Sequence, residues 1–260
     1  MAEKIRRPAS RNLTAGICTS GSKVKLSLLA GGRFYGASRK SLNQEKILFS
    51  MLDGLLRPQR AGLPDISTLC VVSGPGRFTG LRVGLTLASA LKTLAGVKVY
   101  TCTLFEILAA QAAASREFRA WASFRKEPRL AVITHAFKDE YFCQLFTLAD
   151  RKGKHAGSMF TPVEGPRWLK GEETAEYIKS AGEEIYAIAD AEEKPDIYSL
   201  VPAGTEKAAA RISKILPGFV IRAGLALKNR DLTPLYLKPA KYELDAKPRV
   251  PGKTDTGRKI

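Results

Sequence analysis

A glycine-rich stretch lies between an expected strand and an expected helix, Ser73-Gly74-Pro75-Gly76-Arg77-Phe78-Thr79-Gly80-Leu81-Arg82-Val83-Gly84. Gly74 and Gly76 permit backbone dihedrals and close approaches that other residues resist. Backbone N–H groups at the start of the helix could hold an anion. A tight turn with close helix packing explains the glycines equally well. The pattern predicts a strand–turn–helix unit, and both roles stay open.

The helix predicted over 79–95 is apolar around most of its circumference. Its polar residues fall in one narrow stripe: Arg82, Thr86, Ser89 and Thr93. Small residues at a spacing of four form a track where another helix could pack closely: Gly80, Gly84 and Ala88. Such a helix is buried on more than one side. We therefore expect a partner to cover part of it, and a charged substitution at Gly84 or Ala88 to block that contact.

The rest of the first half alternates strands and helices. Three β-like runs separated by short polar or glycine-rich turns cover 13–19, 24–29 and 33–39. A capping box at Ser41–Gln44 predicts a helix over 41–56, and a second one at Thr103–Glu106 opens an alanine-rich helix. Strands are expected over 69–73 and 97–101. The first helix has one broad apolar face that includes Ile47 and Met51, with Phe49 on its flank.

A second unit is expected after Pro128. Strands over 130–134 and 141–148 are joined by a polar turn at 135–140, and a charged loop covers 150–157. Acidic helices over 172–181 and 205–215 and a strand over 185–189 follow. The predicted division is a basic arm at 1–12, an N-terminal lobe at 13–125, a C-terminal lobe at 126–240 and a basic, disordered tail at 241–260.

Composition narrows the class of protein. With 260 residues, 45% of them hydrophobic, the chain has enough apolar material for a core. No run approaches the roughly 18 apolar residues of a membrane-spanning helix, and no apolar segment follows the basic N-terminus as in a secretory signal. The four cysteines are widely separated without a CxxC pair, which argues against disulfides and zinc. We expect a soluble, cytoplasmic protein with no membrane partner.

Charge is strongly positive and uneven. The formal net charge is +17, and residues 1–40 alone carry nine basic groups against one acid. Residues 171–237 carry a net negative charge. A positive field raises the local concentration of polyanions such as RNA. General solubility explains the charge equally well, because net charge bears on association and not on fold.

The stretch GPGRFTGLRVG resembles the GPGSFTGLRIG signature of the TsaB (YeaZ) family, with Arg77 in place of Ser. Residues 43–48 resemble its HSERLL segment with Asn43 in place of His, residues 135–141 resemble its DARRGEVY segment, and residues 234–238 resemble its PxYLR segment. The resemblance implies an α/β, actin/Hsp70-like (ribonuclease H-like) two-lobe fold, with mixed sheets flanked by helices.

The resemblance also implies a function. The family is a non-catalytic scaffold partner of the TsaD enzyme in forming N6-threonylcarbamoyladenosine at tRNA position 37, and has been described as a glycoprotease-like M22 peptidase homologue. Implied partners are a TsaD-like catalytic subunit, a TsaE-like ATPase, a second copy of the chain when alone, and tRNA through the basic surface. The motif and interface residues are Gly74, Pro75, Gly76, Phe78, Thr79, Gly80, Leu81, Arg82, Gly84, Ala88, Ile47, Phe49 and Met51.

No catalytic residue or metal ligand is predicted. Cys18 stands where the family and its active relatives carry the Asp that holds Mg²⁺ against nucleotide phosphates. The two histidines, His135 and His155, form no HxxxH pair, and neither a GxSxG nor an HExxH motif occurs. We expect no intrinsic cofactor, with ATP or ADP and Mg²⁺ at an interface shared with the partner as the alternative. The competing functions are a nucleotide-binding actin-like ATPase and a basic RNA-binding module.

Overall fold

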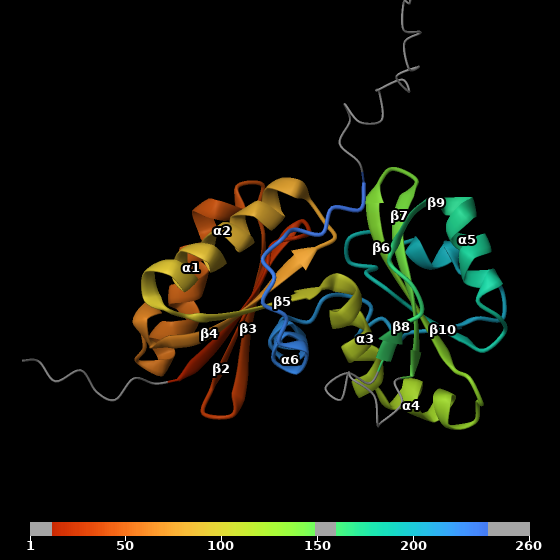
Figure 1. Cartoon of the computed structure of the whole chain (residues 1–260), viewed down its shortest axis with the longest axis horizontal. Helices are drawn as coiled ribbons and strands as arrows, with labels where there is room; N and C mark the ends of the chain where they lie inside the picture. Colours follow the sequence, from red (N-terminus) through yellow and green to blue (C-terminus); the bar gives the residue numbers. More distant parts are fainter. Residues whose placement is uncertain (1–11, 149–159, 239–260) are drawn as a thin grey trace, which may run out of the picture.

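The computed structural model describes residues 12–148 and 160–238, which form two sheets and the helices around them (Figure 1). The first sheet has the order β3-β2-β1-β4-β5 and contains β1 (Leu13–Cys18), β2 (Lys23–Ala30), β3 (Arg33–Lys40), β4 (Ile66–Gly74) and β5 (Lys98–Thr103). The second has the order β11-β10-β6-β7-β8 and contains β6 (Arg129–Phe137), β7 (Glu140–Leu148), β8 (Phe160–Pro162), β10 (Ile185–Ala189) and β11 (Glu206–Lys207). A further strand, β9 (Arg167–Lys170), also pairs with β7.

The two sheets repeat one topology. In each, an antiparallel hairpin (β1–β2, β6–β7) supplies the central strands, and a strand after a crossover helix (β4, β10) lies parallel to the first strand of that hairpin. A right-handed crossover is the usual route back to a parallel neighbour. The mixed α/β architecture predicted from the sequence is confirmed. Residues at or directly after the carboxyl ends of β1, β4, β6 and β10 line one cavity.

The helices form layers on either side of the sheets (Figure 1). They are α1 (Gln44–Leu56), α2 (Phe78–Ala95), α3 (Leu104–Ala114), α4 (Arg116–Ser123), α5 (Gly171–Ser180) and α6 (Pro217–Leu227), with short 3₁₀ turns at Arg57–Gln59, Leu63–Asp65 and Ile197–Leu200. α1 and α2 cover one face of the first sheet, α3 and α6 lie between the sheets, and α5 covers the far face of the second. Along β1, Ile17 therefore packs in the core beneath α1 and α2, while the alternate residue Cys18 packs in the core between the sheets.

Local patterns predicted most elements, but some of the predicted bounds and element types are wrong. The capping box at Thr103 is confirmed, since the Glu106 N–H donates to Thr103 Oγ1 at 3.2 Å and the Thr103 N–H donates to Glu106 Oε2 at 2.7 Å. The box at Ser41 is wrong: α1 begins at Gln44, whose side-chain amide donates to the Gly21 carbonyl at 2.7 Å instead. The β6–β7 turn is shorter than the predicted 135–140, because β6 continues to Phe137.

The helix predicted over 205–215 is also wrong. Its first residues form β11, which pairs with β10, and the buried Gln111 side chain donates to the carbonyls of Ile212 and Lys214. These tertiary hydrogen bonds replace a helical ladder. α6, which follows, was not predicted, and it packs on the first sheet although it lies in the segment 126–240 that we expected to form the second lobe. Residues 1–11 of the arm predicted over 1–12, the loop at 150–157, His155 and the tail at 241–260 lie outside the described residues.

In the part of the chain that the structure describes, no helix is both long and apolar enough to cross a lipid bilayer.

Candidate binding cleft between the lobes

The glycine-rich loop acts first as a packing device. Gly74 and Gly76 have φ of 141° and 157°, a region that favours glycine. A Cβ on Gly74 would lie 2.6 Å from the Leu235 carbonyl oxygen, and one on Gly76 would lie 2.5 Å from the Ser20 carbonyl oxygen. The Arg77 N–H also donates to the Ser20 carbonyl at 2.8 Å. The loop therefore joins the β1–β2 hairpin to the chain segment after α6, with Pro75 buried between them.

The small-residue track of α2 faces its own sheet. A Cβ on Gly80 would lie 2.0 Å from the Thr19 carbonyl oxygen, and one on Gly84 would lie 2.6 Å from Thr19 Oγ1. Ala88 is fully buried in the core beneath α1 and α2, and Leu81 is fully buried as well. The expectation that this track is open to a partner helix is wrong: the close contact it permits is between α2 and the end of β1.

The apolar surface available on these helices lies on their outer edges. Two rows at a spacing of four, one on each helix, are half-buried against the core beneath: Ile47, Met51 and Leu55 of α1, and Val83, Leu87 and Leu91 of α2. We call these six residues the outer seam. Phe49 lies beside it and is 53% exposed. Thr79 and Arg82 are exposed at the start of α2.

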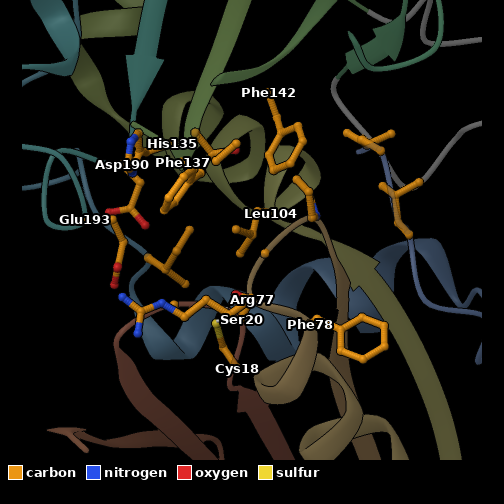
Figure 2. A pocket seen from close by; sticks show the side chains of 18 of the residues that line it. Cys18, Ser20, Arg77, Phe78, Leu104, His135, Phe137, Phe142, Asp190 and Glu193 are labelled. Atoms are coloured by element: carbon orange, nitrogen blue, oxygen red, sulfur yellow. Dashed lines mark hydrogen bonds between the residues drawn. The ribbon is translucent and has the colours of Figure 1, made fainter. Parts of the chain in front are cut away.

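A cavity of about 1090 Å³ opens between the lobes (Figure 2). Cys18, Ser20 and Arg77 line its first-lobe side, and His135, Phe137, Asp190 and Glu193 line the other; Leu104 and Phe142 supply apolar wall. In Figure 2 the Arg77 side chain extends across the cleft toward Glu193. Residues of the glycine-rich loop, Pro75 to Phe78, line the cavity as well.

Ion pairs and hydrogen bonds join the two lobes beside this cleft. Glu192 Oε1 accepts from Lys23 Nζ at 2.7 Å, and its Oε2 lies 2.5 Å from Lys25 Nζ, whose side chain is 5% exposed. Glu193 Oε1 accepts from both the N–H and the hydroxyl of Ser22 at 2.8 Å. Burial opposes ionisation of Glu192, but the hydrogen bonds from the two lysines outweigh it and lower the pKa of this carboxyl. The β1–β2 hairpin of one lobe is thus bonded to the turn after β10 of the other.

Two further titratable groups line the cleft near these ion pairs. Burial raises the pKa of the Cys18 thiol even though Lys25 favours the thiolate, so the thiol is neutral and hydrogen-bonded with Ser20 Oγ at 3.2 Å. Burial also raises the pKa of Asp190 to about 6, against the attraction of Lys25 and with the repulsion of Glu193 and Glu192. An acid whose pKa is higher in the folded state than in the unfolded state binds more protons when the protein is folded.

Asp190→Asn is expected to stabilise the protein at neutral pH. Between about pH 4 and pH 6 the Asp190 carboxyl keeps its proton in the folded protein but loses it in the unfolded chain. The free energy of unfolding therefore falls as the pH rises through this range. Above pH 6 the total loss is about 3 kcal/mol at most. The variant removes this penalty. Urea unfolding at pH 4.5 and pH 7.5 should show a gain for the variant that is clearly larger at pH 7.5.

Asp53→Asn, on the exposed side of α1, is the matched control and is expected to change stability by less than about 0.5 kcal/mol at either pH. An equal gain for Asp190→Asn at both pH values would show that its carboxyl carries no such penalty.

Sequence reasoning did not find the cluster of Lys25, Asp190, Glu192 and Glu193. Its signal is an acidic triplet directly after the strand at 185–189, but only the meeting of the two sheets places it against β2. His135 lines the cleft, and its Nε2 is 2.9 Å from the Lys138 carbonyl oxygen. Across residues 12–148 and 160–238, no three His, Cys, Asp or Glu side chains are placed together to hold a metal ion.

Residues 39–213 match the family described as TsaD, tRNA N6-adenosine threonylcarbamoyltransferase. The match covers more than half of the chain. The chain belongs to this family. Membership in the TsaD family supports a role connected with threonylcarbamoyladenosine in tRNA.

The fold is similar to that of YeaZ from Pseudomonas aeruginosa, with a TM-score of 0.62 and 19% sequence identity, over 87% of this chain and 100% of that chain. A second structure, of an uncharacterized protein from Pseudomonas aeruginosa with similarity to peptidase YeaZ, gives a TM-score of 0.61 at the same identity and coverage. These likenesses confirm the predicted two-lobe α/β fold with mixed sheets flanked by helices. No curated protein matches the chain.

Proposed function

We propose that the chain is a non-catalytic partner subunit of a TsaD-type threonylcarbamoyltransferase, required to form N6-threonylcarbamoyladenosine at tRNA position 37. Membership in the TsaD family supports the proposal that the chain contributes to this reaction. The proposal that the chain is non-catalytic rests on the side chains at the inner end of the cleft. There, a neutral thiol and a buried lysine–glutamate pair occupy the place where an acid would hold Mg²⁺ against a nucleotide.

The residues present do not fit a Mg²⁺–nucleotide. Magnesium requires oxygen ligands, usually carboxylates, and the side chain at the end of β1 is the Cys18 thiol. Lys25 adds a buried positive charge close to that thiol, and Asp190 holds its proton more readily than an ordinary acid because burial raises its pKa to about 6. No phosphoryl-transfer step follows from this cleft. A nucleotide at an interface shared with the partner stays a prediction.

The outer seam supports the partner role. Its six apolar side chains are only half-covered by the chain's own core, and they lie in two parallel rows on neighbouring helices. A partner that presents an equivalent helix pair would complete a four-helix contact, which buries both rows. Two copies of this chain could meet in the same way when the enzyme is absent. A TsaE-like ATPase as a further partner stays a prediction.

The test is reconstitution of threonylcarbamoyl transfer to tRNA with a TsaD-type subunit, in the presence and absence of this chain. We expect transfer to depend on the chain, and Cys18→Ser to keep the rate within about twofold of the unmodified protein, because the thiol takes part in no bond-forming step. Cys143→Ser, a buried cysteine of the second lobe that does not line the cleft, controls for the cost of burying a hydroxyl. A loss of about 100-fold with Cys18→Ser in an intact complex would make the thiol catalytic.

A further inference from the structure

The mouth of the cleft gathers exposed aromatic rings from both lobes. Phe78 at the start of α2 and Tyr236 after α6 have ring centroids 5.1 Å apart, and Phe137 ends β6 on the opposite side. These three side chains are 51%, 45% and 58% exposed. Exposed apolar side chains scattered singly need no explanation, but several gathered at one opening indicate a binding surface. All three line the same cavity.

Cations accompany these rings. The Arg82 guanidinium carbon lies 3.7 Å from the Phe78 ring centroid, and Lys138 Nζ lies 5.5 Å from that of Phe137. Neither cation has a carboxylate within ion-pair distance among the residues the structure describes, whereas Lys238 near Phe137 is paired with Glu140. Two uncompensated cations are therefore held against aromatic faces at the two sides of one opening.

The wall of the cavity carries an unused hydrogen-bonding group. Thr134 lies one residue before His135 on β6, is 3% exposed and lines the cavity. Its hydroxyl has no hydrogen-bond partner within residues 12–148 and 160–238. A buried hydroxyl without a partner is costly. A ligand that enters the cavity with a polar edge would satisfy it.

We propose that the mouth of the cleft binds a single-stranded RNA segment. Bases stack on the Phe78–Tyr236 pair and on Phe137, and Arg82 and Lys138 contact the phosphates. One unstacked base enters the cavity with its polar edge toward Thr134. The proposal rests on the proposed function in one respect: the single-stranded RNA is taken to be a loop of tRNA.

The combination of groups favours RNA over other anions. Single strands are recognised by aromatic rings on which bases stack, together with cations that follow the backbone. An acidic peptide would use the cations but not the three rings. A free mononucleotide would fill the cavity but would not span both sides of its mouth. The chain's net charge of +17 adds the long-range attraction that brings a polyanion to this surface.

The experiment measures binding of a labelled tRNA anticodon stem-loop to the full chain by fluorescence anisotropy at several salt concentrations. The double variant Phe137→Ala/Lys138→Ala is expected to weaken binding about tenfold or more, because stacking on one ring alone accounts for a factor of this size. Loss of one phosphate contact should reduce the slope of log affinity against log salt by about 0.7. Arg82→Ala should reduce the slope by a similar amount.

Phe124→Ala/Lys126→Ala is the matched control, because it removes an exposed phenylalanine and a nearby exposed lysine remote from the cleft. It should change affinity by less than about twofold. Equal weakening by both double variants would mean that net charge alone binds the RNA. Competition by AMP or by polyglutamate as effective as that by unlabelled stem-loop would assign the surface to a mononucleotide or to an acidic peptide.

The same variants separate this inference from the proposed function. Co-purification with the TsaD-type subunit uses the outer seam, so Phe137→Ala/Lys138→Ala should bind that subunit normally while losing RNA. Leu87→Glu in the seam should show the reverse pattern. If the mouth variant loses the subunit and keeps the RNA, the cleft mouth is a protein contact and the RNA proposal is wrong.

Discussion

Gly80→Ala is expected to destabilise the first lobe by more than about 3 kcal/mol, at or beyond the upper end of ordinary overpacking costs. The added Cβ would lie 2.0 Å from the Thr19 carbonyl oxygen, and this neighbour is backbone that cannot rotate away. Relief requires α2 to move off β1, which would open the core beneath both helices. Urea denaturation followed by circular dichroism measures the loss directly.

Gly54→Ala provides a matched control. Gly54 lies within α1, and a Cβ there would meet no atom within 4 Å. The same substitution is therefore expected to stabilise the protein by about 0.5–1 kcal/mol, because alanine loses less backbone entropy than glycine on entering a helix. Equal unfolding midpoints for the two variants would contradict the close contact between α2 and β1.

Because the small-residue track of α2 packs against the first sheet, a charged substitution in this track cannot test a partner interface. Gly84 and Ala88 both face the sheet, so Gly84→Glu and Ala88→Glu each place a carboxylate in the core and are expected to destabilise the fold. Loss of association in either variant would report unfolding and not a blocked interface. The interface has to be tested on the outer seam.

Leu87→Glu and Ile47→Glu are expected to weaken binding to a TsaD-type subunit by about 30-fold or more, the effect of losing a central interface side chain. Threonylcarbamoyl transfer should fall in proportion to the complex lost. Both side chains are only half-buried in the isolated chain, so the fold should persist with a nearly unchanged unfolding midpoint. Binding is measured by titration calorimetry or by co-purification.

Ser89→Glu adds the same charge to the exposed opposite flank of α2 and serves as the control. It should leave binding and transfer within about twofold of the unmodified chain. If Leu87→Glu and Ile47→Glu stay folded and bind normally, the outer seam is not the interface. The same result would remove the structural support for the partner role.

The parts of the cleft that sequence predicted are those formed by consecutive residues. The glycine-rich loop lines the cleft as a strand–turn–helix unit, and the substitution at Cys18 is visible in the sequence because it concerns one position in a recognisable hairpin. The three acids Asp190, Glu192 and Glu193 follow a predicted strand, but they match no recognisable motif that would place them in a cleft. They become part of the cleft only because β10 lies beside β6 and ends opposite the β1–β2 hairpin.

Elements whose signals act within a few residues can be predicted from the sequence alone: the cap at Thr103, the strand–glycine–helix unit and the apolar face of α1. Contacts between distant parts of the chain establish which side of α2 faces the sheet, and that residues 205–215 form no helix. Gly80 lies against the carbonyl of Thr19, directly after β1, and the Gln111 side chain of α3 donates to the carbonyls of Ile212 and Lys214. These partners are distant along the chain, so no local period or propensity encodes the contact.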